Sequence, residues 1–347
     1  MTGSGTPSDR PQRHRHDRET DGQTTDGIAP PPKPVARRLG ACLASAALVT
    51  ATTLIATSCS TAGEKAPASS SATAPLEPSK GTLLGHYYGD GTVDETDARI
   101  GTTPAIHLNY YGWEDDWSAS EATLDDLSSN RIPLVNWEPF DVDFDDIIDG
   151  SLDATIEKHA DGAKELGEPF FLDFAAEMNE EEGWGGHDPE RYVAAYRHVH
   201  DVFDDHGASN VVWVWAPNVT DSADAPEAMS YYPGDRYVDW TGVDGYNWGT
   251  SEPDFAWQSF TELFRDIYGE LADIGKPIII GETGSDETGG SKAEWIEGIV
   301  PGLKDEFPLI KALVWFDVDK ERHWQINSSP ATLAAYRRMA ADPYLAP

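Results

Sequence analysis

Eight short apolar runs alternate with amphipathic segments along residues 83–316, and this order limits the folds open to the chain. Each run is four to seven residues long and rich in β-branched and aromatic side chains, which is typical of buried strands. Between the runs, apolar residues recur at spacings of three and four, as at Tyr192, Tyr196 and Val199, which indicates helices. The runs are residues 83–88, 105–110, 132–137, 169–175, 211–216, 237–243, 277–280 and 312–316.

Local signals at the ends of the helical segments agree with this periodicity. Asp188 and Ser329 each precede a proline, which is a common way for a helix to begin. Gly207 and Gly275 follow helical runs, where a glycine commonly ends the helix. The sequence lacks the Gly-rich phosphate loop that is usual in doubly wound sheets. It therefore predicts an α/β fold of the (β/α)8 TIM-barrel type, as a single domain over residues 82–346.

The charge of the chain excludes several classes of partner. Its 347 residues hold 61 Asp and Glu against 25 Lys and Arg, which gives a formal net charge of −36. Nucleic acids and anionic membrane surfaces attract basic patches, and no cluster of Lys and Arg here is strong enough to overcome the acidic field. We therefore expect no nucleic-acid partner. The acidic surface favours solubility, or tolerance of high salt, because salt screens repulsion between like charges.

Residues 1–59 have the features of an export signal. Arg37 and Arg38 precede residues 41–58, which are mostly Ala, Leu, Val and Thr. The paired arginines are typical of the twin-arginine route. Residues 60–81 are rich in Ser, Ala, Pro and Thr, so we expect a flexible linker in front of the folded domain.

A cysteine at the end of the apolar stretch bears on the compartment. Cys59 follows Ala56, Thr57 and Ser58, and this run of small residues resembles the cleavage box of bacterial lipoproteins. Cys59 would then carry a lipid that holds the protein on the extracellular face of the cell membrane, its one contact with a membrane. The alternative is an ordinary signal peptide and a secreted protein. Cys42 lies inside the signal, so we expect no internal disulfide in the mature chain.

Two glutamates close apolar runs that we interpret as barrel strands. Glu177 follows residues 170–176, and Glu282 follows residues 277–281. The carboxyl ends of the strands of a (β/α)8 barrel meet at one rim, which is where the active sites of such enzymes lie. Two carboxyl groups at one rim are what hydrolysis of a glycosidic bond requires. The pair therefore predicts a glycoside hydrolase.

Four segments at strand ends carry a family likeness. Residues 176–179 read Ala-Glu-Met-Asn, and residues 212–218 read Val-Trp-Val-Trp-Ala-Pro-Asn. Residues 239–246 read Asp-Trp-Thr-Gly-Val-Asp-Gly-Tyr, and residues 281–284 read Gly-Glu-Thr-Gly. Together they resemble glycoside hydrolase family 26 over almost the whole domain. Members of that family are retaining enzymes on a (β/α)8 barrel, mostly endo-β-1,4-mannanases, with some β-1,3-xylanases and mixed-linkage glucanases.

The resemblance implies roles for particular residues. Glu177 would be the general acid/base, Glu282 the nucleophile, and Tyr246 the tyrosine that hydrogen-bonds the nucleophile. The fourth strand departs from the family pattern, because Asp173 and Ala176 stand where Arg and His are usual. We expect these two changes to alter the central sugar-binding subsite. A carboxylate of Asp173 inside the barrel would also need a partner.

Aromatic and amide side chains near the strand ends are candidates for sugar binding. Sugars present apolar C–H faces, so a glycan cleft needs aromatic platforms with polar groups at their edges. We expect Trp315, on the eighth run, to form the floor of the central subsite. Asn179 and Asn247 are expected to bind sugar hydroxyls, although asparagine is equally ordinary in turns. The tryptophans expected as outer platforms are Trp113, Trp137, Trp184 and Trp248.

The acidic segment 141–146 invites comparison with a calcium loop. The helix-loop-helix calcium pattern needs Gly at its sixth position and Glu at its twelfth, and here Asp146 and Leu152 stand there. We therefore expect a solvated acidic loop, with no metal and no cofactor.

The combined interpretation is a monomeric retaining endo-β-glycosidase that acts on a neutral β-linked polysaccharide. The substrate expected first is β-1,4-mannan or glucomannan. The alternatives are a β-1,3-xylanase or a mixed-linkage β-glucanase of the same family. A carbohydrate-binding protein with weakened catalysis is a further alternative.

Overall fold

The computed structural model describes residues 73–89, 91–180 and 183–345. The contacts divide the chain into two units, Met1–Pro67 and Ala68–Pro347, and the described residues belong to the second. The expected export signal, the lipidation site at Cys59 and most of the expected linker therefore lie outside the described residues. Within these ranges, no helix combines the length and the apolar character that a membrane crossing requires.

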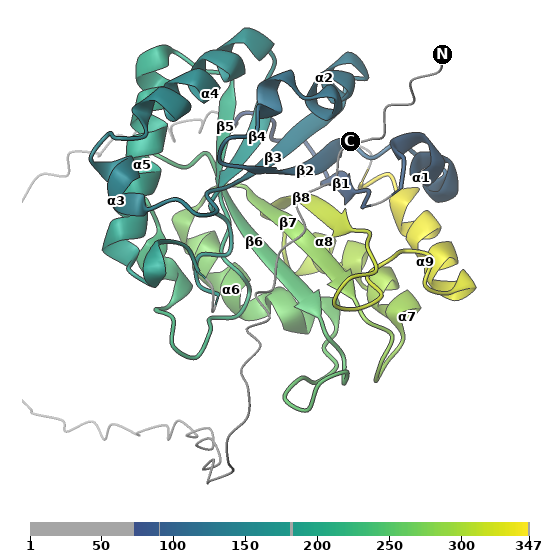
Figure 1. Cartoon of the computed structure of the whole chain (residues 1–347). Helices are drawn as coiled ribbons and strands as arrows, with labels where there is room; N and C mark the ends of the chain where they lie inside the picture. The colour runs from purple at the N-terminus through teal and green to yellow at the C-terminus, as the bar shows by residue number, and fades with distance from the viewer. Residues whose placement is uncertain (1–72, 90, 181–182, 346–347) are drawn as a thin grey trace, which may run out of the picture. The chain divides into compact units, whose positions relative to one another are not determined.

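Eight parallel strands form one closed barrel in the order of the sequence, with β1 paired to β8 (Figure 1). Each run predicted from the sequence overlaps one strand, so the predicted (β/α)8 barrel is confirmed. The strands are β1 (Leu83–Tyr87), β2 (Ile106–Gly112), β3 (Ile132–Glu138), β4 (Phe170–Phe174), β5 (Val211–Trp215), β6 (Trp240–Asn247), β7 (Ile278–Ser285) and β8 (Ile310–Phe316).

Helices lie around the barrel and connect its strands (Figure 1). One connection departs from strict alternation, since residues 216–239, between β5 and β6, hold only the short 3-10 helix η3 (Ala228–Tyr231). The other helices are α1 (Val93–Ile100), η1 (Trp117–Ala119), α2 (Glu121–Ser128), α3 (Phe144–Ile148), α4 (Asp153–Leu166), η2 (Trp184–Gly186), α5 (Pro189–His206), α6 (Phe260–Ile274), α7 (Lys292–Glu297), α8 (Ile299–Asp305) and α9 (Pro330–Ala340).

The predicted helix ends are confirmed by the cap geometry. The Asp188 side chain accepts hydrogen bonds from the first turn of α5, and Ser329 caps α9 in the same way. α5 and α6 end at Gly207 and Gly275, whose φ angles of 74° and 81° lie in the left-handed region that glycine adopts readily.

Side chains of the strands alternate between the barrel interior and the layer under the helices. On β8, Ala312 and Val314 belong to the interior cluster, whereas Leu313 and Trp315 belong to the cluster under the helices. On β4, Phe171 is an interior residue, so Asp173 also faces the interior, as its spacing from Glu177 predicts.

A bulge in β7 changes this alternation next to the carboxyl end of the strand. Val243 of β6 pairs with Ile280 and Asp244 pairs with Glu282, so Gly281 is an extra residue. A Cβ atom on residue 281 would lie 2.7 Å from Asp244 Oδ1, so the Asp244 side chain would have to shift to admit it. Because a shift of one residue exchanges the two faces of a strand, the bulge directs Glu282 to the interior side, beside Asp244.

The folded unit begins before residue 82, the expected start of the domain. Trp240 Nε1 donates a hydrogen bond to the Pro75 carbonyl at 2.8 Å, and Ala74 and Leu76 pack against the interior cluster. The last residues of the expected linker are therefore part of the barrel's packing.

Candidate active site

Glu282 lies near the carboxyl end of β7 and is held by a tyrosine from β6. Its side chain is almost buried, and Tyr246 donates its hydroxyl hydrogen to Glu282 Oε2 at 2.5 Å. Burial, and then the charges of Glu282 and Glu177, raise the pKa of Tyr246 well above its usual value. The phenol therefore keeps its proton and remains a donor to the carboxylate.

Glu177 lies just after β4, in a turn with unusual backbone geometry. Ala175 and Glu177 have φ angles of 54° and 57°, a region that residues other than glycine adopt rarely. The turn is fixed to β5, since Glu177 N donates to the Ala216 carbonyl at 2.8 Å. Asn218 Nδ2 donates to Glu177 Oε1 at 2.8 Å and also to Glu180 Oε1 at 2.8 Å. The carboxylate of Glu177 is thus oriented by an amide from the next strand.

Glu177 and Glu282 both interact electrostatically with Tyr246 and Asp244. The charges of Glu177 and Glu282 both raise the pKa of Tyr246, and both raise that of Asp244. The structure therefore brings Glu177, Glu282 and Tyr246 together at the carboxyl ends of β4, β6 and β7.

Two buried aspartates lie beneath the glutamates. Asp173 on β4 and Asp244 on β6 are 3% and 1% exposed, and both face Gly281. Among the described residues, Asp173 Oδ1 and both carboxyl oxygens of Asp244 have no hydrogen-bond partner. Burial, and then the charge of Glu282, raise the pKa of both groups well above the usual value. Protonation therefore removes the cost of burying two charges under Glu282.

Replacing Asp244 by Asn is expected to remove a loss of stability that grows with pH. A carboxyl with a raised pKa in the folded state binds its proton more tightly than in the unfolded state. The contribution of this carboxyl to the free energy of unfolding is complete below about pH 3.9, its pKa in the unfolded state. It then decreases by up to about 1.4 kcal/mol per pH unit until the pH reaches the pKa of the folded state. The Tm of the natural chain should therefore fall relative to that of Asp244→Asn between pH 4 and pH 8.

The comparison depends on the other groups that face Asp244. These are Asp173, Glu177, Glu282, Tyr110 and Tyr246, and all are retained in the variant. Asp305→Asn, at an exposed position at the end of α8, is the control and should keep the natural pH profile. Parallel Tm profiles for Asp244→Asn and the natural chain would contradict the prediction.

Three of the predicted aromatic platforms are buried. Trp315 is fully buried under the helices, where its Nε1 donates to the Trp324 carbonyl at 3.0 Å. Trp137 is also fully buried and stacks on Trp113 at 4.6 Å between ring centroids. These rings offer no face to a sugar, which corrects the predictions for Trp315, Trp137 and Trp113. The residue that β8 turns towards the glutamates is Phe316, whose ring packs against Tyr246 at 5.8 Å.

Both predicted asparagines are buried and form hydrogen bonds within the protein. Asn179 is fully buried, and its amide donates to the Asn218 carbonyl and to Asp221, while its oxygen accepts from Asn218 N. Asn247 is 1% exposed, and its amide bonds Ser285 and the backbone of the loop that follows β6. The expectation that they bind sugar hydroxyls is therefore corrected. Asn179 acts instead by fixing Asn218, which holds Glu177.

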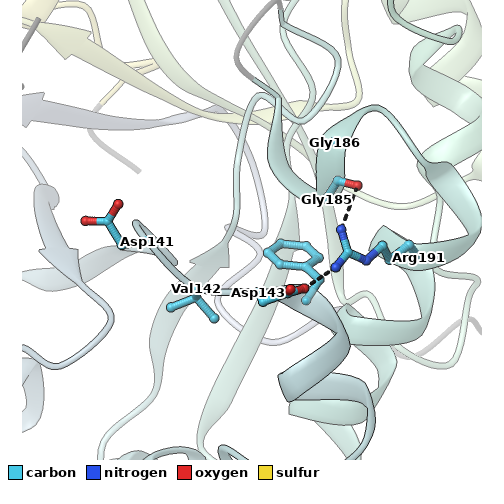
Figure 2. A pocket seen from close by; sticks show the side chains of 7 residues that line it. Asp141, Val142, Asp143, Gly185, Gly186 and Arg191 are labelled. Carbon is cyan, nitrogen blue, oxygen red and sulfur yellow. Dashed lines mark hydrogen bonds and ion pairs between the residues drawn. The ribbon is translucent and has the colours of Figure 1, made fainter. Parts of the chain in front are cut away.

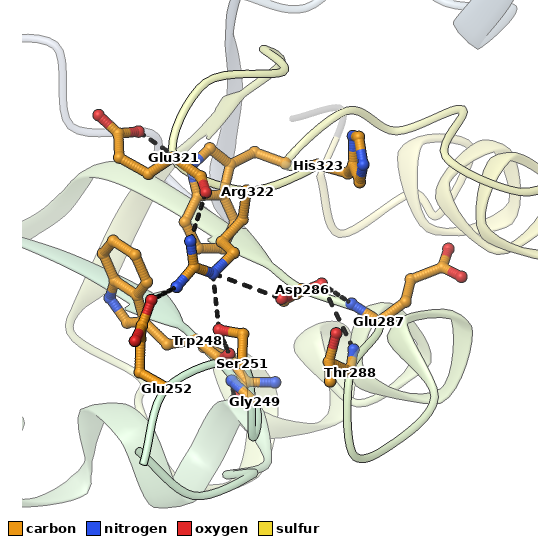
Figure 3. A network of polar contacts seen from close by, with 12 residues as sticks. Trp248, Gly249, Ser251, Glu252, Asp286, Glu287, Thr288, Glu321, Arg322 and His323 are labelled. Carbon is orange, nitrogen blue, oxygen red and sulfur yellow. Dashed lines mark hydrogen bonds and ion pairs between the residues drawn. The ribbon is translucent and has the colours of Figure 1, made fainter. Parts of the chain in front are cut away.

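Trp184 and Trp248 are partly exposed and remain candidates near the site. Trp184 Nε1 donates to the Ala176 carbonyl at 2.7 Å, one residue before Glu177. Trp248 lies under the guanidinium of Arg322, whose Cζ is 5.1 Å from the ring centroid. Arg322 Nε also donates to Ser251 Oγ at 2.6 Å and lies 3.7 Å from Asp286 Oδ2 (Figure 3). Arg322 thus joins the loops that follow β6, β7 and β8.

Sequence reasoning missed Asn218 and Arg322. Asn218 closes the fifth strand in the same way that Glu177 closes the fourth, so the strand-end criterion applied to all polar residues would have found it. Arg322 lies in the loop after β8, where no sequence pattern indicates its partners.

A shallow pocket of about 340 Å³ lies beside this region and contains neither glutamate. It is lined by residues 141–144, Gly185, Gly186 and Arg191 (Figure 2). The Arg191 guanidinium contacts Asp143 and donates from Nε to Asp145 Oδ1 at 2.7 Å. Arg191 thus pairs with two carboxylates of the acidic segment. In the described part of the chain, no group of three or more His, Cys, Asp or Glu side chains is arranged to hold a metal ion.

The closed barrel and the two glutamates at its carboxyl rim define a glycoside hydrolase. The sequence profile of glycosyl hydrolase family 26 matches residues 98–285, which is more than half of the chain. The chain belongs to glycosyl hydrolase family 26, as its strand-end motifs indicate.

Three named proteins are similar to this chain in sequence. Endoglucanase H of Acetivibrio thermocellus is 39% identical over 266 residues, which cover 74% of this chain and 30% of that protein. β-1,3-Xylanase TXYA of a Vibrio species is 22% identical, over 72% of this chain and 59% of that protein. A mannan endo-1,4-β-mannosidase of Bacillus subtilis is 29% identical, over 48% of this chain and 45% of that protein. The chain thus spans less than two thirds of the length of each.

Solved structures of the family share the fold. The GH26 β-mannanase of Bacteroides ovatus superposes with a TM-score of 0.58 at 17% identity, covering 77% of this chain and 90% of that one. At this level of identity the likeness concerns the fold alone.

Proposed function

We propose that the chain is a retaining endo-β-glycosidase in which Glu282 is the nucleophile and Glu177 is the general acid/base. The observation that carries this proposal is the hydrogen bond of 2.5 Å from Tyr246 to Glu282, in a site that also contains Glu177. A phenol donor fixes one carboxylate oxygen and leaves the other to attack. Glu177, held by Asn218, lies on the loop that can meet the leaving group.

The proposed reaction proceeds in two displacements. Glu282 attacks the anomeric carbon while Glu177 protonates the departing glycosidic oxygen, which gives a covalent glycosyl-enzyme. Glu177, now ionised, removes a proton from water, and the water's oxygen displaces Glu282 from the anomeric carbon. Two inversions give net retention. The role of Tyr246 is to hold the carboxylate of Glu282 in one orientation throughout.

The substrate proposed first is a neutral β-linked glucan. Support comes from the 39% identity to Endoglucanase H, well above the identities to the mannanase and xylanase relatives. Asp173 and Ala176 also replace the Arg and His that are usual in this largely mannanase family, so the central subsite differs beside Glu177. β-1,4-Mannan or glucomannan, the substrate predicted from the sequence, is the second candidate because mannanases are among the relatives.

A panel of polymers tests the proposal. Barley-type mixed-linkage β-glucan, β-1,4-mannan, glucomannan and β-1,3-xylan should be incubated with the purified chain. Reducing ends and the anomer first released should then be measured. We expect β-anomers and a rapid fall in viscosity with at least one polymer, most strongly with the β-glucan. Release of α-anomers would contradict the retaining mechanism, and binding without hydrolysis would favour a carbohydrate-binding protein.

A further inference from the structure

Two exposed aromatic rings lie in loops at the rim that carries the glutamates. Four large apolar side chains of the described residues are more than a third exposed, namely Leu124, Phe140, Ile148 and Phe255. Leu124 and Ile148 lie on helices, whereas Phe140 follows β3 and Phe255 follows β6. Phe140 is 45% exposed and Phe255 is 46% exposed. In a closed barrel of eight strands, β3 and β6 are three strands apart, so these loops leave the rim from nearly opposite sides.

The ring of Phe140 is connected to Glu177 through one tryptophan. Phe140 packs against Trp184, with 5.1 Å between ring centroids and an interplanar angle of 64°. Trp184 is itself fixed by its hydrogen bond to the Ala176 carbonyl, next to Glu177. An exposed ring that is held in this way keeps its orientation when a ligand arrives.

The ring of Phe255 is connected to Glu282 through a longer aromatic chain. Phe255 stacks on Trp248, with 5.3 Å between centroids and an interplanar angle of 17°. Trp248 meets Trp324 edge to face at 5.2 Å, and Trp324 packs on Tyr246 at 4.8 Å. Tyr246 in turn donates to Glu282. Arg322 lies against Trp248 and ties this assembly to the neighbouring loops (Figure 3).

We propose that Phe140 and Phe255 are two sugar-binding platforms, one on each side of the glutamate pair, for pyranose rings of one neutral β-linked chain. This inference rests on the proposed function and extends it to the path of the polymer. Pyranose C–H faces stack on such rings, and a neutral glycan avoids the repulsion that the net charge of −36 imposes on anionic partners. Platforms on both sides of the glutamates require cleavage inside a chain.

Variants with one platform removed test this inference. Phe140→Ala, Phe255→Ala and the double variant should be compared with Leu124→Ala, which removes an exposed apolar side chain from α2. We expect each single variant to lower kcat/KM on the polymer by about ten-fold, equivalent to about 1.4 kcal/mol. The double variant should lose about a hundred-fold if the two platforms act independently. Turnover of an aryl β-disaccharide, which is too short to reach both platforms, should fall less than turnover of the polymer, and the Tm should stay within about 2 °C of that of the natural chain.

Binding gives a second measurement that does not need hydrolysis. In native gels that contain the polymer, the natural chain and Leu124→Ala should be retarded, and the double variant should not. Equal retardation of all variants, or equal loss of activity on polymer and on aryl glycoside, would overturn the platforms while leaving the proposed function intact. Retarded but inactive natural protein would overturn the proposed function alone. A natural chain that no polymer retards would overturn the platforms.

Discussion

Glu282→Gln is expected to abolish hydrolysis of every polymer that the natural chain cleaves. Glutamine keeps the size of the side chain and its contact with Tyr246, but its amide cannot form the glycosyl ester. Loss of a nucleophile costs on the order of 10⁴ to 10⁶ in kcat in enzymes where it has been measured, and we expect a loss in this range. Release of reducing ends measured over days, with a mechanism-based fluoroglycoside as label of the nucleophile, checks the result.

The matched control for this change is Glu306→Gln. Glu306 is an exposed glutamate that pairs with Arg265 far from the rim, so its replacement should leave kcat unchanged. Mass spectrometry of the labelled natural chain should place the sugar on Glu282. A label on another residue, or more than a tenth of the natural activity in Glu282→Gln, would show that the nucleophile lies elsewhere.

Glu177→Ala is expected to produce a different defect, which a small anion repairs. Without the acid, kcat/KM on a polymer should fall by about 10² to 10⁴, the usual contribution of general acid-base catalysis. An aryl glycoside with an acidic leaving group needs no proton, so its glycosyl-enzyme should still form and then accumulate. Azide fits the space of the deleted carboxyl and attacks without a general base, so it should restore turnover and give a β-glycosyl azide.

Glu180→Ala is the control within the same loop. Glu180 accepts a hydrogen bond from the same Asn218 amide as Glu177 but is not proposed to take part in the reaction. Its loss should change activity by less than about ten-fold, and azide should have no effect. Absence of azide rescue in Glu177→Ala, or rescue in Glu180→Ala, would show that the acid/base is assigned wrongly.

The barrel could be predicted from the sequence because its signals are local. A strand buried on both faces appears as a continuous apolar run, and helix ends depend on single residues such as Asp188 and Gly275. The rim positions of Glu177 and Glu282 follow from the same runs. These features depend on a few neighbouring residues, so no knowledge of distant contacts was needed.

The aromatic platforms could not be assigned in the same way. Residues 314–316 read Val-Trp-Phe, and such an all-apolar run does not show which side chains face the interior. The choice of Trp315 over Phe316 is an error of one residue, and on a strand one residue exchanges the two faces. Trp113 and Trp137 fail for a related reason, since they stack on each other under the helices.

The polar residues near the site depend on contacts between distant segments. The side of the barrel on which Asp173 lies follows from strand spacing, but its neighbour Asp244 comes from another strand across Gly281. Asn179 and Asn247 resemble sugar ligands in the sequence, and only their bonds to Asn218 and Ser285 reveal a structural role.

The bulge at Gly281, and not simple alternation, decides on which side of the sheet the proposed nucleophile lies. A regular β7 of the same length would turn Glu282 towards the helices and away from any substrate, whereas the bulge keeps it opposite Asp244. A side chain at residue 281 would displace Asp244, because its Cβ atom would lie 2.7 Å from Asp244 Oδ1. Strand pairing therefore decides whether Glu282 can act, and a more regular β7 of this length would be an inactive one.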